Sequence, residues 1–414
     1  MNKPLNRFYI KNDNAINWSV ALFHEVFDFL SSKPISRDQL NYEAGVCKNI
    51  HYGDILTKLP SIVEYNSPII PYVNSDIDTR LFSSLNSGDI VIADTAEDYM
   101  VGTAVEVSVN DGEVITAGLH TMACRPKIKF AKSYLGYYLN SPAFHNQLKR
   151  LVTGSKVLAI NKSEIINTVI KFPSFEEQQK IAEFFTALDE KIRIKRAHIM
   201  QTEKLKTYVM KQVFSGQMRF GYKVKWTEKK FKDVLDIERG SSPRPISKYL
   251  CDSEDGLNWI KIGDAPIKGN RITSAKEKIL PSGLKQSRMV HKGELLLSNS
   301  MSFGRPYILE VDGCIHDGWL VIRNHNNIFN LDFLVYLLAS DEVKKQYKKL
   351  AGHGVVSNLN KDLVSEVILR YPPLNEQNTI AQMLNSVDNK IALQKNQLES
   401  LEKLKKAFMQ RMFV

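Results

Sequence analysis

One pattern occurs twice in this chain, and this duplication constrains the fold more than any other feature of the sequence. The segment FPSFEEQQKIAEFFTALDEKI at residues 172–192 returns as YPPLNEQNTIAQMLNSVDNKI at residues 371–391. Both copies keep a Pro, a Glu-Gln pair, an Ile-Ala pair and an Asp-x-Lys-Ile segment at a constant shift of 199 positions. Internal repeats indicate a fold built from copies of one structural unit.

The repeat covers nearly the whole chain. The shift of 199 also aligns residues 133–151 with 332–350, and a shift of 208 aligns the segment from Trp18 with the segment from Trp226. The change in shift indicates insertions or deletions between these regions. A unit of about 200 residues is much longer than a solenoid repeat and is the size of a domain followed by a connecting element.

The first part of each copy predicts a mixed domain of strands and helices. Short apolar runs bounded by turn residues, such as SGDIVIAD at 87–94 and KGELLLSNS at 292–300, are typical of strands. Helical stretches follow near 134–151 and 333–350. The sequence therefore predicts an α+β fold.

After the next proline in each copy, the apolar residues recur at alternating spacings of 4 and 3, which is the a/d seam of a coiled coil. Two matched helices in one chain most simply pack on each other. Polar residues such as Lys206 and Lys405 occupy matching seam positions, where they either fix the register or lie at frayed ends. The seam positions are Ile181, Phe185, Leu188, Ile192, Lys195, Ile199, Thr202, Lys206, Val209 and Val213 in the first copy, and Ile380, Leu384, Val387, Ile391, Gln394, Leu398, Leu401, Lys405, Phe408 and Met412 in the second.

The charge of the chain favours an acidic partner. Its net charge is +11, and its isoelectric point is near 9.2, which suits nucleic acid or an anionic membrane surface. No apolar run approaches the roughly 18 residues that span a bilayer, and the N-terminus lacks the apolar centre of a secretory signal. We therefore expect a cytoplasmic protein.

The usual signatures of catalysis and metal binding are missing from the sequence. It contains no phosphate-binding G-x-x-x-x-G-K-[ST] loop, no H-E-x-x-H segment and no C-x-x-C pair. YPPL at 371–374 lacks the Asn or Asp of the amino-methyltransferase motif that it superficially resembles. We therefore expect no catalytic site and no metal in this chain, although a dispersed catalytic triad leaves no local motif.

Polar loops at matching places in the two copies are candidates for contacts with DNA. Phosphate contacts need basic or polar side chains, and base edges are read best by Arg, Asn and Gln. Each loop alone is more often just a solvated turn, but the matching positions in both copies favour a role in binding. The candidates are Lys33, Arg37, Thr95, Lys156, Asn161 and Lys162 in the first copy, and Arg239, Ser241, Ser242, Arg244, Asn299, Ser300, Arg305, His353 and Lys361 in the second.

A Glu-Gln pair opens each long helix. Glu177 and Gln178 in the first copy match Glu376 and Gln377 in the second. An acidic residue in the first turn suits the positive end of the helix dipole. The pair therefore serves either as helix-start chemistry or as a docking contact for a partner.

These features together make the chain similar to a known family. The paired P-x-x-x-E-Q-x-x-I-A segments at 173–182 and 372–381, each continuing into D-x-K-I and a long heptad segment, resemble the specificity (S) subunit of type I restriction-modification systems. The segments IERGSSPRP, WIKIGD and LLLSNSMSFGR of the second copy resemble its target-recognition domains. The resemblance covers the whole chain.

The resemblance implies an α+β fold with internal two-fold pseudosymmetry. Two mixed α/β target-recognition domains, at 1–172 and 221–371, would be separated by two long antiparallel spacer helices, at 173–220 and 372–414, which form an intramolecular coiled coil. Each domain would read one half of a split double-stranded DNA target.

The same resemblance implies a non-catalytic subunit without a cofactor of its own. It would dock two methylation (M) subunits, which use S-adenosylmethionine to methylate adenine at N6. Restriction (R) subunits, which cleave DNA with ATP and Mg²⁺, would join through the M subunits. The alternatives are a stand-alone DNA-modifying enzyme and a coiled-coil scaffold without a nucleic-acid role.

The first copy departs from the family pattern in its loops. It has FLSSKPI at 29–35 in place of a Gly-Ser-x-Pro loop, and the acidic segment DTAEDY at 94–99 where a polar loop is expected. The sequence therefore leaves the base-reading residues of the first copy open.

Overall fold

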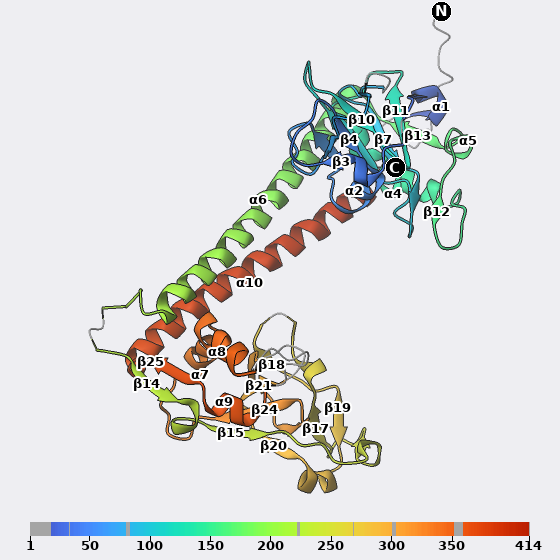
Figure 1. The fold of residues 1–414 in the computed structure, drawn as a ribbon. Helices are drawn as coiled ribbons and strands as arrows, with labels where there is room; N and C mark the ends of the chain where they lie inside the picture. The colour runs from blue at the N-terminus through green and yellow to red at the C-terminus, as the bar shows by residue number, and fades with distance from the viewer. Residues whose placement is uncertain are drawn as a thin grey trace, which may run out of the picture. The chain divides into compact units, whose positions relative to one another are not determined.

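The computed structural model describes residues 18–32, 34–79, 83–221, 224–267, 269–299, 304–351 and 359–413. The chain divides into two compact units, Met1–Arg196 with Asn396–Val414, and Ala197–Lys395. Each unit contains one strand-rich domain, the start of one long helix and the end of the other (Figure 1). None of the described helices is long and apolar enough to cross a membrane.

The first unit is built on a five-stranded sheet. In this sheet only β5 and β9 pair in parallel. The strand order is β2 (Phe27–Phe29), β11 (Thr121–Pro126), β7 (Ile90–Ala93), β9 (Ala104–Ser108) and β5 (Ile62–Glu64). The central strand β7 is buried on both faces, because Ile90 and Ile92 join one apolar cluster while Val91 and Ala93 join another.

A second sheet and several short elements complete the first unit. The sheet order is β10 (Ile115–Ala117), β4 (Lys48–Ile50), β6 (Tyr72–Val73) and β3 (Leu40–Asn41). The short elements are β1 (Ser19–Leu22), α1 (Phe23–Val26), η1 (Arg37–Gln39), α2 (Tyr52–Thr57), β8 (Thr95–Ala96), α3 (Tyr134–Tyr138), α4 (Pro142–Leu148), β12 (Leu158–Ala159), α5 (Lys162–Ile165) and β13 (Val169–Phe172).

The second unit repeats the order of the main sheet. Its strands are β15 (Asp236–Arg239), β24 (Trp319–Arg323), β21 (Leu295–Ser298), β22 (Pro306–Leu309) and β18 (Arg271–Ile272). Its other sheet has the order β16 (Leu250–Cys251), β19 (Glu277–Ile279), β17 (Leu257–Ile260), β23 (Gly313–Ile315) and β20 (Arg288–Val290). The remaining elements are β14 (Thr227–Lys230), η3 (Phe231–Asp233), η4 (Ile246–Lys248), η5 (Ile262–Asp264), η6 (Pro281–Gln286), α7 (Leu331–Leu338), α8 (Asp341–Ala351), α9 (Lys361–Ser365) and β25 (Ile368–Tyr371).

Strand register confirms the duplication seen in the sequence. Ser19 of β1 pairs with Phe172 of β13, and Thr227 of β14 pairs with Tyr371 of β25. These two pairs are related by the shifts of 208 and 199 that relate the two copies of the sequence. The insertions or deletions that change the shift therefore lie in the segments between β1 and β13 and between β14 and β25.

The long helices α6 (Phe175–Phe214) and α10 (Leu374–Arg411) contain 40 and 38 residues. All of the predicted seam positions are buried or half-buried, which confirms the heptad seam. In the first unit Asp189 of α6 pairs with Lys405 of α10. Further along α6, Arg196 pairs with Glu402, which precedes Lys405 on α10. Because the residue number rises along one helix while it falls along the other, the helices run antiparallel there.

The second unit shows the same antiparallel pairing. Lys206 pairs with Asp388, and Glu203 pairs with Lys395. Together with the two similar domains, this pairing confirms the predicted fold class. The polar seam residues Lys206 and Lys405 are not frayed, because the ammonium group of each lies 2.6 Å from a carboxylate on the opposite helix.

Candidate nucleic-acid interface

Three loops of the second unit converge on the turn between β23 and β24. Arg239, the last residue of β15, donates from Nε to the main-chain oxygen of Asp317 at 3.2 Å, and Ser242, in the loop that follows, donates from Oγ to Asp317 Oδ1 at 3.3 Å. Arg244 Nη2 lies 3.7 Å from Asp317 Oδ2, while the Arg244 side chain is 83% exposed. This loop therefore presents a cation that is held close to a fixed carboxylate.

The other two loops reach the same turn through Asn299, which directly follows β21. Asn299 Nδ2 donates to the main-chain oxygen of Asp317 at 2.9 Å, and its main-chain N–H donates to Gly318 O at 3.0 Å. The main-chain N–H of Leu359 donates to Asn299 O at 3.0 Å. The structure thus brings Arg239, Ser242, Arg244 and Asn299 together.

His316 and Asp317 lie on the turn that the loops contact, and neither residue was predicted from the sequence. His316 Nδ1 accepts from the Gly318 N–H at 3.0 Å, and His316 Nε2 lies 2.9 Å from Asp317 Oδ1. The ring also packs edge-on against Trp259 with centroids 6.0 Å apart. The only sequence signal was that the tripeptide His-Asp-Gly directly precedes a buried strand.

The other candidates of the second unit lie apart from this turn or outside the described residues. The Arg305 guanidinium donates to Ile267 O and Gly269 O, at 3.0 and 2.7 Å, and so braces that neighbouring loop. Ser241 is half-buried, and Lys361 is exposed in the first turn of α9. Ser300, His353 and, in the first unit, Lys33 lie outside the described residues.

The first unit has the same main-chain hydrogen bonds at the place where its loops meet, but it presents different side chains there. Asp94 N–H donates to His120 O at 3.1 Å, and Ile160 N–H donates to Asp94 O at 2.9 Å. These bonds correspond to those that Asn299 makes with Gly318 and Leu359. Asp94 therefore occupies the place of Asn299, and His120 occupies the place of Gly318.

The side chains at this place form a polar cluster. Thr95, a predicted contact residue, donates from Oγ1 to Asp94 Oδ1 at 2.9 Å. His120 Nδ1 lies 3.6 Å from Asp94 Oδ1 and 3.5 Å from Thr95 Oγ1. The imidazole packs edge-on against the ring of Tyr52, with centroids 5.2 Å apart. Asp94, His120 and Tyr52 were not among the candidates from the sequence.

Arg37 belongs to a neighbouring ion-pair group. Its Nη1 donates to Oδ2 of the buried Asp54 at 2.8 Å, and this hydrogen bond to the carboxylate raises the pKa of Arg37. Lys58 Nζ lies 3.1 Å from Asp54 Oδ1. Burial and the nearby Arg37 lower the pKa of His51, whose ring packs at a tilt against the ring of Tyr52 with centroids 4.6 Å apart. The side chain of Arg37 is thus an exposed cation whose position is restrained by its ion pair with Asp54.

The remaining candidates of the first unit are exposed near the same cluster. Lys156 lies in a loop that is closed by a bridge between Thr153 and Ala159. Asn161 is the N-cap of α5, and Lys162 Nζ lies 5.2 Å from the centroid of the Phe29 ring. Strand β12 connects this loop to the cluster, because it pairs with β8 next to Asp94.

Three of the four helix-start residues are buried inside their own unit. Gln178 Oε1 accepts from Ala131 N–H at 3.1 Å, and Gln377 Oε1 accepts from Asn330 N–H at 2.9 Å. Glu376 accepts two hydrogen bonds from Arg219, from Nε at 2.8 Å and from Nη2 at 2.9 Å. Only Glu177 is half-buried rather than buried. These contacts favour the helix-start interpretation, and docking through the pair stays a prediction.

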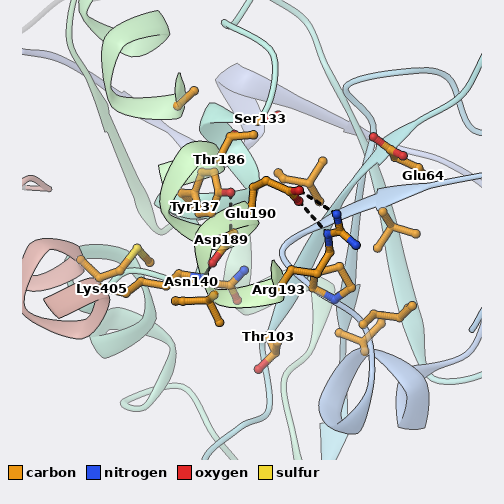
Figure 2. Close-up of a pocket in the computed structure, with 18 of the residues that line it drawn as sticks. Glu64, Thr103, Ser133, Tyr137, Asn140, Thr186, Asp189, Glu190, Arg193 and Lys405 are labelled. Carbon is orange, nitrogen blue, oxygen red and sulfur yellow. Dashed lines mark hydrogen bonds and ion pairs between the residues drawn. The ribbon is translucent and has the colours of Figure 1, made fainter. Parts of the chain in front are cut away.

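Each unit also has a concavity beside its pair of long helices. In the first unit Tyr137 OH donates to Asp189 Oδ2 at 3.0 Å, and Lys405 Nζ lies 2.6 Å from Asp189 Oδ1 (Figure 2). Burial raises the pKa of Tyr137. Glu190 and Arg193, which also line it, form an ion pair (Figure 2). The concavity has a volume of about 1760 Å³.

The concavity of the second unit, of about 940 Å³, has an equivalent triad. Tyr336 OH donates to Asp388 Oδ2 at 2.7 Å, and Lys206 Nζ lies 2.6 Å from Asp388 Oδ1. Tyr336 and Asp388 match Tyr137 and Asp189 at the shift of 199. The part of the chain that the structure describes contains no group of three or more His, Cys, Asp or Glu that could hold a metal ion.

The chain is built from a duplicated α+β unit with paired long helices, and its polar loops differ between the two copies of the scaffold. This architecture defines a class of proteins with two recognition domains. The sequence matches the family described as type I restriction modification DNA specificity domain at residues 17–204 and 223–403. The chain belongs to this family and is a specificity subunit of a type I restriction-modification system. The expectation of a non-catalytic chain agrees with this family and with its relatives.

Two relatives come from Methanocaldococcus jannaschii. A protein assigned as the MjaX specificity subunit of a type I restriction enzyme is 27% identical over 95% of this chain and 92% of its own length. The MjaVIII specificity subunit is 25% identical over 63% of this chain and 65% of its own length.

Solved structures share the fold. The S subunit of the type I restriction-modification system from M. genitalium is 15% identical, with a TM-score of 0.57 over 98% of both chains. The HsdS subunit from Thermoanaerobacter tengcongensis is 19% identical, with a TM-score of 0.50 over 95% of both chains.

Proposed function

We propose that this specificity subunit binds a split DNA target and reads one half-site with each unit. The observation that carries the proposal is the repeated loop convergence, at Asp94 and His120 in one unit and at Asn299 and Gly318 in the other. The scaffold is kept while the side chains that it presents differ. Two readers of different half-sites need this combination.

The charges of the loops support DNA as the ligand. Arg244 and Arg37 are exposed cations, each close to a carboxylate that restricts where its guanidinium can lie. A fixed Arg is well suited to the O6 and N7 acceptors of guanine, whereas a freely moving cation serves a phosphate. With a net charge of +11, binding is expected to weaken as salt rises.

We further propose that the chain docks two methylation subunits at equivalent places. The Tyr-Asp-Lys triads at Asp189 and Asp388 lie in concavities that match under the repeat, so one type of partner surface fits both. Restriction subunits would join through the methylation subunits. S-adenosylmethionine, ATP and Mg²⁺ would then belong to these partners, and this chain would hold no cofactor.

The test is to co-express the chain with its methylation subunit and to map methylated adenines in host DNA by single-molecule sequencing. A motif of two defined halves around an undefined spacer is the expected result. A contiguous motif, or random methylation, would contradict the proposal. Methylation by the purified chain alone would favour a stand-alone enzyme, and a complex that binds no DNA even at low salt would favour a scaffold.

A further inference from the structure

Each unit places one carboxylate and one imidazole at the convergence of its loops, but the carboxylate comes from a different element in each unit. In the second unit both groups lie on the turn, at His316 and Asp317, while Asn299 follows the strand. In the first unit Asp94 follows the strand and His120 lies on the turn. The two carboxylates therefore have different surroundings.

The carboxylate of the second unit is committed to its own loops. Asp317 Oδ1 is within hydrogen-bond distance of both Ser242 Oγ and His316 Nε2, and Oδ2 faces Arg244. Both nitrogens of His316 are used within the turn. Asp317 therefore positions the groups around it.

The carboxylate of the first unit keeps an open acceptor. Thr95 and His120 both approach Asp94 Oδ1, and no described residue donates to Oδ2. The Asp94 side chain is 27% exposed, and the side chain of His120 is 48% exposed. The Asp317 and His316 side chains are similarly exposed, at 29% and 42%, so the two pairs differ in the uncommitted Oδ2 of Asp94 rather than in exposure.

The backbone at His120 points to a role for its side chain. His120 has a φ of 54°, in the left-handed region, whereas Gly318, which takes its place in the second unit, does not have a positive φ. A residue with a side chain is strained in this region, and such strain is often retained where the side chain serves function. The edge-on contact with Tyr52 and the contact with Asp94 fix the orientation of the ring.

The local charge indicates which part of DNA this pair can bind. Asp94 is followed closely by Glu97 and Asp98, both exposed, so the segment repels phosphate groups. The DNA groups that donate to a carboxylate in the major groove are the exocyclic amino groups, N4 of cytosine and N6 of adenine. An acidic loop on a basic chain is thus suited to a base edge rather than to the backbone.

We propose that Asp94 and His120 are specificity-determining residues of the first unit. Asp94 accepts a hydrogen bond from the exocyclic amino group of an adenine or a cytosine in one half-site, and the His120 imidazole lies beside it as a second hydrogen-bonding group. This inference rests on the proposed split-site recognition and names the chemistry of one half of it.

The test uses two variants in the full chain, assembled with its methylation subunit. Asp94→Ala removes the acceptor. His120→Gly removes the imidazole and installs the residue that the second unit has at this place, so the turn is expected to fold. Asp111→Asn, which changes an exposed carboxylate in the turn between β9 and β10, is the matched control.

Mapping of methylated adenines is expected to show that both variants relax one half of the motif and leave the other half unchanged. The preference at the affected base pair should fall about 10- to 100-fold, the range for loss of a good base contact. Asp111→Asn should reproduce the wild-type motif.

A second experiment identifies the amino group. Duplexes in which one adenine is replaced by purine, or one cytosine by 2-pyrimidinone, lack a single amino group. Competition binding is expected to show about a 10-fold loss for the wild-type complex at one such position and no further loss for Asp94→Ala. The base whose replacement has this effect distinguishes adenine from cytosine.

The outcomes separate this inference from the proposal that it rests on. A wild-type motif without two halves would overturn the proposed function, and this inference with it. A split wild-type motif that stays unchanged in both Asp94→Ala and His120→Gly would overturn the inference alone.

Discussion

At the residue scale, Glu106 is a buried carboxylate with a structural task. Its side chain accepts from the main-chain N–H groups of Ser133 and Gly136, at 2.6 and 2.9 Å, at the start of α3. Burial raises its pKa to about 7 in spite of these bonds. The pKa of the folded state thus exceeds that of the unfolded chain, so the unfolded chain ionises first as the pH rises.

This difference predicts a specific pH dependence. Between pH 4.5 and 7 the folded state should lose stability relative to the unfolded chain, by about 1.4 kcal/mol for each pKa unit. Glu106→Gln cannot ionise, so its melting temperature should vary less with pH across this range than that of the wild type. Calorimetric scans from pH 4.5 to 8 measure both profiles, and parallel profiles would contradict this account of Glu106.

The ion pair of Arg219 with Glu376 predicts a second residue-scale effect. Glu376 is 0% exposed, so removing its partner leaves a buried charge unpaired. Arg219→Ala is expected to lower the free energy of unfolding by about 3 kcal/mol. Arg193→Ala, which breaks the exposed pair with Glu190, is the control and should have little effect. Equal changes in chemical denaturation would refute the structural role of this pair.

Residue-scale roles were the least predictable from sequence. The Glu-Gln pairs were recognised, but burial of Gln178, Glu376 and Gln377 depends on loops that are distant in sequence. The same holds for His316 and Asp317, whose partners Ser242 and Asn299 come from different loops. A motif search cannot find contacts that only the folded chain assembles.

At the scale of elements, the seam of α6 and α10 was predictable because a heptad pattern is local. The ion-pair partners of its polar members Lys405 and Lys206 were not predictable, because Asp189 and Asp388 lie outside the a/d positions. The structure shows that Lys405 and Lys206 tie the two helices together in each unit. These pairs fix the register of the helices.

A charge swap tests this register. Asp189→Lys places two ammonium groups together and should lower the melting temperature, while the double variant Asp189→Lys with Lys405→Asp should restore most of the loss. A coupling energy of about 1 to 2 kcal/mol is expected from a double-mutant cycle that is followed by circular dichroism. Additive effects of the two substitutions would show that the pair does not fix the register.

At the scale of the whole molecule, duplication was the most predictable property. The shifts of 208 and 199 in the sequence reappear in the register of β1 with β13 and of β14 with β25. The repeated strand order could not be derived, because apolar runs indicate strands without giving their neighbours. The candidate site was predicted as loops, and the structure adds the turns on which they converge.

The central claim is that each unit reads its own half of a split target, and a domain exchange tests it most directly. Residues 1–172 are replaced by the corresponding segment of a related specificity subunit with a known motif, and the complex with the methylation subunit is verified by size-exclusion chromatography. The methylated motif is then mapped by single-molecule sequencing. We predict a motif that changes in one half and keeps the other, whereas an unchanged motif, or a change in both halves, would contradict the account.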